Sequence, residues 1–66
     1  MIEVGHGRAV AVAKKAIALA ERNVGPDHPD VATSLENLAA LYREMKRTKE
    51  AEALEQRAAR IRTIQR

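Results

Sequence analysis

The chain has 66 residues, which limits it to one small domain. It contains no cysteine, so neither a disulfide nor a cysteine-based zinc site can reinforce its core. Twelve basic and nine acidic side chains give a formal charge of +3, a mixed balance that is not typical of nucleic-acid-binding proteins. The first four residues are too few for a signal peptide, and no long uncharged apolar run is present, so a cytoplasmic location without a membrane span is expected.

The apolar residues are small, and this limits the core. Phe and Trp are absent, Tyr42 is the one aromatic residue, and much of the apolar content is alanine, which buries little area per side chain. In chains below roughly 70–80 residues, a single core rarely supplies more than a few kcal/mol of stability. Self-association or a larger host protein is therefore the expected source of additional burial.

The first predicted helix covers residues 7–23 and carries two adjoining apolar stripes. One stripe consists of Val10, Ala13, Ile17 and Ala20. The other consists of Ala9, Val12, Ala16 and Leu19. Each stripe follows the three- and four-residue spacing of a helix face. A helix that is apolar over so wide an arc is expected to have neighbours on more than one side.

A stop signal separates the first helix from the second. Gly25 can adopt the left-handed conformation that closes a helix, and Pro26 cannot donate a hydrogen bond to continue it. Pro29 suits the first turn of the next helix, where its missing N–H has no intrahelical partner anyway. Asp27 or His28 is then the expected N-cap, and the sequence leaves both alternatives open.

The second and third predicted helices cover residues 29–45 and 48–64. The apolar face of the second consists of Val31, Leu35, Leu38, Tyr42 and Met45, with Leu41 beside them. The apolar stripe of the third consists of Ala51, Leu54, Ala58 and Ile61. The connection between them is short, which implies that the two helices pack antiparallel. The chain is therefore predicted to be all-α, with three helices in a single unit that spans residues 1–66.

The chain also contains an internal repeat. A shift of 42 residues (from position 9 to position 51) superimposes the second stripe of the first helix on the stripe of the third. The shift places Ala9 on Ala51, Val12 on Leu54, Ala16 on Ala58, Leu19 on Ile61 and the basic Lys15 on the basic Arg57. The first helix is therefore predicted to be an earlier copy of the third, so one complete helical hairpin follows the second helix of another.

Four segments carry a resemblance to a known family. They are the linker GPDHPD at 25–30, NLAALY at 37–42, EAEA at 50–53 and QRA at 56–58. Together these segments resemble the tetratricopeptide repeat of the kinesin light chain type, and the resemblance covers roughly residues 8–62. It implies a three-helix, tetratricopeptide-like architecture.

The repeat period alone would also suit a HEAT or armadillo repeat. The Pro- and Asp-rich linker and the small residues Ala39, Ala51 and Ala58 fit the tetratricopeptide form better. The chain departs from that form at Lys46, where a glycine is usual in the turn, and at Glu55, where an aromatic residue is common. Glu55 makes the outer face of the third helix polar, as expected for a helix that ends an array.

The resemblance implies a non-enzymatic protein–protein interaction scaffold, in which the first helix of each hairpin lines a groove for a peptide or helix. In this chain the groove-lining residues would be Thr33, Glu36, Asn37, Ala40, Arg43 and Glu44. Asn37 stands where the family often uses an asparagine to bond the backbone of a ligand, because an amide both donates and accepts.

The first helix provides a second expected interaction surface, because it lacks the helix that would complete its own hairpin. The residues expected to be partly exposed, and to pair two copies as a homodimer, are Val10, Ala13, Ile17 and Ala20.

An enzyme is not expected, and neither is a cofactor or a metal. The candidate groups are His6, Asp27, His28, Asp30 and Ser34. Catalysis needs a concave pocket that excludes water, and three short helices do not provide one. The acidic and histidine residues of the linker also lack a fourth metal ligand and the usual ligand spacing.

A nucleic-acid or acidic-surface adaptor is the alternative function. It would use the C-terminal arginines Arg57, Arg60, Arg62 and Arg66. The interpretation is less favoured, because no aromatic side chain lies nearby to stack on bases. Basic side chains late in a helix also complement its dipole without any ligand.

Overall fold

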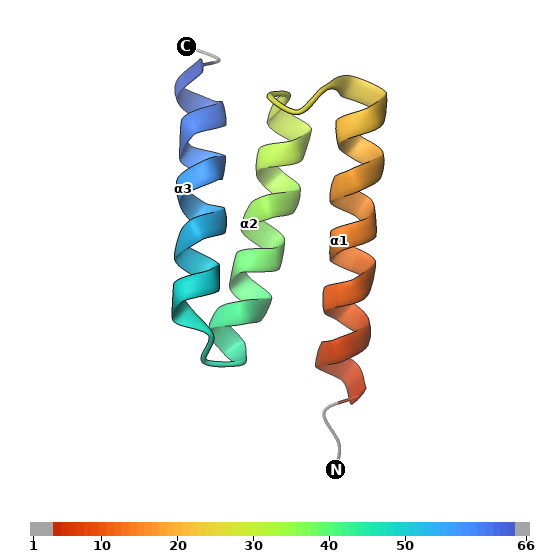
Figure 1. The fold of residues 1–66 in the computed structure, drawn as a ribbon, viewed down its shortest axis with the longest axis vertical. Helices are drawn as coiled ribbons and strands as arrows, with labels where there is room; N and C mark the ends of the chain where they lie inside the picture. The colour runs from red at the N-terminus through yellow and green to blue at the C-terminus, as the bar shows by residue number, and fades with distance from the viewer. Residues whose placement is uncertain (1–3, 65–66) are drawn as a thin grey trace.

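The computed structural model describes residues 4–64, with side chains from residue 7 onward. It contains three helices, α1 (Val4–Val24), α2 (Pro29–Glu44) and α3 (Thr48–Ile64). They lie side by side with alternating direction, and α2 lies between α1 and α3 and packs against both (Figure 1). The dimensions of 43 × 23 × 11 Å correspond to a single layer of helices. The all-α prediction is therefore confirmed for these residues.

Helix α1 begins at Val4, three residues before the predicted start at Gly7. Glycine lowers helix propensity without blocking the backbone hydrogen bonds as proline does, so Gly5 and Gly7 do not end the helix. Helix α1 ends at Val24, one residue after the predicted end, and Gly25 closes it as expected. Gly25 has a φ of 97°, and its N–H donates to the carbonyl of Glu21 at 3.0 Å, which closes the helix with a left-handed residue.

The N-cap of α2 is His28, which resolves the alternative between Asp27 and His28. Its backbone is extended, as expected before a proline, and its Nδ1 accepts a hydrogen bond from the N–H of Asp30 at 3.0 Å. Pro29 occupies the first turn, and Asp30 places a negative charge there, which favours the positive end of the helix dipole.

The turn between α2 and α3 contains Lys46, at the position where the resemblance predicts a glycine. Helix α2 ends at Glu44, one residue earlier than predicted, because Met45 is its C-cap. Lys46 then adopts a left-handed conformation with a φ of 65°, and its N–H donates to the carbonyl of Arg43 at 3.0 Å. The N–H of Arg47 donates to the carbonyl of Tyr42 at 2.8 Å, which completes a Schellman motif. This conformation favours glycine, so Lys46 occupies a glycine-like position.

The core lies on both sides of α2. Its buried residues are Ile17, Val31, Ala32, Leu35, Leu38, Ala39, Tyr42, Ala51, Ala58 and Ile61. Six of these ten belong to α2, because the middle helix has a neighbour on each side. Ala39, Ala51 and Ala58 are fully buried, which allows α2 and α3 to pack closely. The predicted apolar faces of the second and third helices are thereby confirmed.

Candidate protein-interaction surfaces

The first apolar stripe of α1 faces α2. Ile17 is 8% exposed, and Val10, Ala13 and Ala20 are partly buried against the same core. The four residues expected to pair two copies are therefore engaged within the chain, which corrects the choice of residues for self-association. Both stripes of α1 are apolar, so apolar spacing alone did not distinguish the one that α2 covers.

The second stripe forms an open apolar surface. We call Ala11, Val12, Lys15, Ala16 and Leu19 the outer face of α1; these five residues line a shallow groove. Val12 is 62% exposed and Leu19 is 51% exposed.

The internal repeat gives the outer face a buried counterpart on α3. Ala58 and Ile61, the repeat matches of Ala16 and Leu19, are each 1% exposed. The two stripes differ in burial because α2 covers the stripe on α3, whereas nothing in the described part of the chain covers the outer face of α1. The outer face is therefore an apolar helix surface that no other described helix covers.

One edge of the outer face is basic. Arg8, Lys15 and Arg22 lie seven residues apart, so they follow one side of the helix, and all three are exposed. We call these three residues the basic edge. Within the described residues none of them forms an ion pair, so no described carboxylate neutralises the positive charge along this edge.

An ion pair between α3 and α1 involves the edge of α3 that corresponds, by the repeat match, to the basic edge of α1. The guanidinium of Arg57 bonds the carboxylate of Glu21, across the helix that separates them. Arg57 is the repeat match of Lys15. A basic side chain at this position of the repeat therefore reaches a carboxylate on the preceding helix of the same type.

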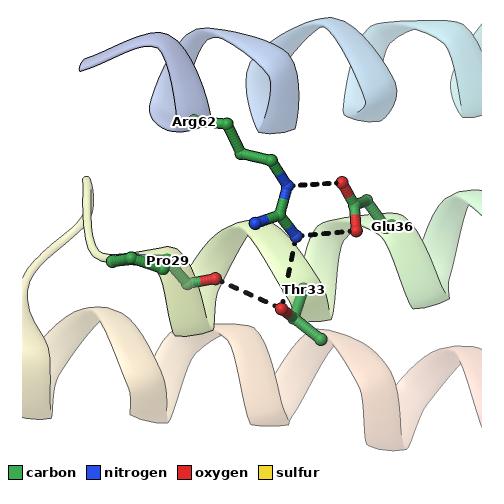
Figure 2. Close-up of polar contacts among 4 residues, drawn as sticks. All are labelled: Pro29, Thr33, Glu36 and Arg62. Atoms are coloured by element: carbon green, nitrogen blue, oxygen red, sulfur yellow. Dashed lines mark hydrogen bonds and ion pairs between the residues drawn. The ribbon is translucent and has the colours of Figure 1, made fainter. Parts of the chain in front are cut away.

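The predicted groove face on α2 is exposed, but part of it is bonded to α3. The guanidinium of Arg62 donates to both carboxylate oxygens of Glu36, at 2.9 and 2.8 Å, and to the hydroxyl of Thr33 at 3.4 Å (Figure 2). The Thr33 hydroxyl donates in turn to the carbonyl of Pro29 at 3.3 Å (Figure 2). Glu36 and Thr33 therefore help to hold the hairpin together.

A second arginine–glutamate ion pair links α2 and α3 nearer the turn. We call this pair and the Arg62–Glu36 pair the two clamps. The guanidinium of Arg43 donates two hydrogen bonds to the carboxylate of Glu55, both of 2.7 Å. Asn37 and Ala40 remain exposed between the clamps, and Asn37 makes no hydrogen bond among the described side chains. Glu44 is exposed at the end of the helix. The groove-lining set expected from the resemblance thus contains clamp residues, which bond α3, and two open residues, Asn37 and Ala40.

Sequence reasoning missed both clamps, although a signal was present. Arg43 and Glu55 lie six residues before and after Lys49, and Glu36 and Arg62 lie thirteen residues before and after it. In an antiparallel hairpin, residues that lie symmetrically about one position near the turn, here Lys49 in the first turn of α3, lie opposite each other. Opposite charges at such mirrored positions would have predicted the two clamps.

The clamps shift the ionisation of their carboxylates. Hydrogen bonds from Arg62 lower the pKa of Glu36, and hydrogen bonds from Arg43 lower the pKa of Glu55. The same bonds raise the pKa of each arginine. All four side chains are well exposed to solvent, so each clamp contributes modestly to stability.

The lowered pKa values predict that acid weakens the fold through these clamps. The unfolded chain takes up protons at Glu36 and Glu55 near the ordinary glutamate pKa of about 4.3, before the folded chain does. Stability from the clamps is therefore present above that pH and is lost as the pH falls through the lower folded pKa values. We expect the melting temperature, followed by circular dichroism from pH 7 to pH 3, to fall less steeply in the Glu36→Gln/Glu55→Gln variant. Parallel curves for the two proteins would contradict this role.

The C-terminal arginines do not form one free cluster. Arg57 bonds Glu21 and Arg62 bonds Glu36, whereas Arg60 is exposed. Arg66 lies outside the described residues. Two of the four positive charges proposed for a nucleic-acid surface are thus paired with carboxylates.

The residues weighed for catalysis or metal binding are dispersed or serve the backbone. His28 caps α2 and Asp30 lies in its first turn, whereas the side chain of His6 lies outside the described residues. Over the described residues no group of three or more His, Cys, Asp or Glu side chains is arranged to hold a metal ion. None of the described helices combines the length and the apolar character needed to cross a membrane.

A single layer of antiparallel helices with a repeated stripe defines the class of α-helical repeat proteins. The sequence model of the tetratricopeptide repeat family matches residues 6–64, and the chain belongs to this family. The predicted family is confirmed, whereas the kinesin light chain type stays a prediction. Neither a curated protein nor a solved structure matches the chain. Tetratricopeptide repeats generally mediate protein–protein interaction.

Proposed function

We propose that the chain is a non-enzymatic protein–protein interaction module whose main docking surface is the outer face of α1. The exposure of Val12 and Leu19 carries this proposal, because the matching positions on α3 are covered by a helix. Contiguous apolar surface that is left exposed is typical of an interaction site. A small core also gains stability when a further helix covers it. A cytosolic location accompanies the proposal as a prediction.

Self-association is the form of docking that the sequence predicts, now transferred to the outer face. Two copies related by a twofold axis would place identical surfaces against each other. In an antiparallel pair centred between Lys15 and Ala16, Val12 of one copy lies opposite Leu19 of the other. The pairing covers both outer faces with one contact. The basic edges also meet in this pair, so we propose that it is weak.

Light scattering over a dilution series tests the proposal, with helicity followed in parallel. We expect the mass to rise from monomer towards dimer as the concentration rises. Leu19→Glu should remain monomeric, because it buries a charge in the contact. Ile64→Glu is the matched control, since Ile64 is 55% exposed but lies on α3. Association that both variants weaken equally would contradict docking at the outer face.

The open residues of α2 are a second proposed surface. Asn37 and Ala40 lie exposed between the two clamps, and an amide side chain suits the backbone of an extended peptide. The clamps support this surface because they fix the direction of α2 relative to α3. A single hairpin offers a shallow groove here, so we rank this surface below the outer face of α1.

A further inference from the structure

We infer that the preferred occupant of the outer face is an amphipathic helix of another polypeptide, built like α2 and with carboxylates along the edge that meets the basic edge. This inference rests on the proposed function and names the chemistry of the partner. Three observations lead to it: the repeat match between α1 and α3, the unpaired charge on the basic edge, and the charge pattern that a second copy would present.

The repeat match identifies the shape of the occupant. Ala58 and Ile61 of α3 are covered by the buried face of α2, whose largest side chains are Leu35, Leu38 and Tyr42. The outer face of α1 presents the same small–large pattern at the matching register, with Ala16 and Leu19. A helix with large apolar residues at the spacing of α2 therefore fits the outer face as α2 fits α3.

The charges identify the edge of the occupant. On α3, the edge formed by Glu55 and Arg62 makes the two charged clamps with α2. The repeat matches of these residues on α1 are Ala13 and Ala20, which carry no charge and cannot form such clamps. Selection by charge is left to the opposite edge, which on α1 is the basic edge. The carboxylate that Arg57 bonds lies on α1 rather than on α2, so the repeat match of Lys15 does not place an acid on the incoming helix. The exposed positive charges of the basic edge themselves make an acidic edge on the incoming helix the complement.

A second copy does not supply such a helix. Among the described residues the exposed large apolar side chains are Val12, Leu19, Val24 and Ile64, and three of these four lie on α1 itself. A twofold antiparallel pair of outer faces brings like edges together, with Arg8 of one copy near Arg22 of the other and the two Lys15 side chains near each other. Like charges at a helix contact are unfavourable, so an acidic-edged helix should displace the second copy.

Two peptides test the inference, both with the sequence of residues 29–45. Positions 34 and 41 lie seven residues apart on the side of this helix opposite Glu36 and Arg43, so they meet the basic edge in the inferred arrangement. The acidic peptide carries Ser34→Glu and Leu41→Glu, and the basic peptide carries Ser34→Lys and Leu41→Lys. Each is labelled with a fluorophore and titrated with the full chain, and binding is followed by anisotropy.

We expect the acidic peptide to bind at least tenfold more tightly than the basic one at low salt. The preference should shrink at about 1 M salt, where the screening length is only about 3 Å. Lys15→Glu should reverse the preference. Lys14→Glu is its matched control, because it changes the same net charge on another side of α1 and should leave the preference intact. Leu19→Glu should weaken both peptides at least tenfold, and Ile64→Glu should weaken neither.

Several results would overturn the inference. Equal affinity for the two peptides would contradict the preference for an acidic edge on the partner. Equal effects of Lys14→Glu and Lys15→Glu would contradict recognition by the basic edge. If a dimer depended on Leu19 and the acidic peptide did not displace it, the occupant of the outer face would be a second copy of the chain. This result would contradict the inference but not the proposed function. If Leu19→Glu affected neither peptide binding nor self-association, both the inferred partner and the proposed docking surface would be wrong.

Discussion

Replacing Ile61 by alanine should lower the free energy of unfolding by about 2–5 kcal/mol, the usual cost of removing a large aliphatic side chain from a packed core. Ile61 is 1% exposed and is one of the largest fully buried side chains of the molecule. Small domains have little stability in reserve, so the variant should be partly unfolded at room temperature. Urea denaturation, followed by circular dichroism in dilute solution, measures the effect.

The internal repeat supplies the control for this experiment. Leu19→Ala shortens an aliphatic side chain at the repeat-matched position of α1, where the side chain is exposed. In the dilute monomer we expect its effect on the free energy of unfolding to stay within about 0.5 kcal/mol. Similar losses for Ile61→Ala and Leu19→Ala would mean that the outer face is covered within the monomer.

Replacing Ala58 by leucine should destabilise the chain by about 1–3 kcal/mol, because a larger side chain would have to enter a tightly packed contact. Ala58 is 1% exposed and lies in the fully packed contact between α2 and α3. The control is Ala16→Leu, at the repeat-matched and exposed position, where the additional methylene groups meet solvent. We expect Ala16→Leu to leave the urea midpoint of the dilute monomer unchanged. Equal shifts of the midpoint in the two variants would contradict the different packing of α1 and α3.

The hairpin of α2 and α3 could be predicted from the sequence, because its signals are local. The apolar spacing of Val31, Leu35, Leu38 and Tyr42 defines one helix face, and that face is buried. The glycine-like position of Lys46 is anticipated by the resemblance and agrees with its left-handed backbone. Each of these features depends on residues within one or two helical turns of each other.

The orientation of α1 could not be predicted in the same way. Its two stripes have similar apolar content, and the choice between them depends on where α2 docks, which is a property of the tertiary structure. The repeat match contained the missing information, because it aligned Ala16 and Leu19 with Ala58 and Ile61 rather than with the residues that face the next helix. The stripe that contains Leu19 should therefore have been expected to face a preceding helix.

The clamps were missed for a different reason. Glu36 and Arg62 are 26 residues apart, and Arg43 and Glu55 are 12 residues apart, so neither pair forms a local motif. Once the turn at Lys46 is fixed, both pairs follow from the mirrored register of the hairpin. Helix periodicity predicted which groove residues are exposed. It did not show that some of them form ion pairs with α3.

The most direct measurement is an amide chemical-shift map of the isotope-labelled chain during titration with the acidic peptide. The outer face of α1 and the exposed face of α2 lie on different helices, so the map distinguishes the two proposed surfaces. We predict that the largest shift changes cluster between residues 11 and 19, and that Leu19→Glu abolishes them. Shift changes centred on Asn37 and Ala40, with residues 11–19 unaffected, would contradict docking at the outer face and place the interaction on α2.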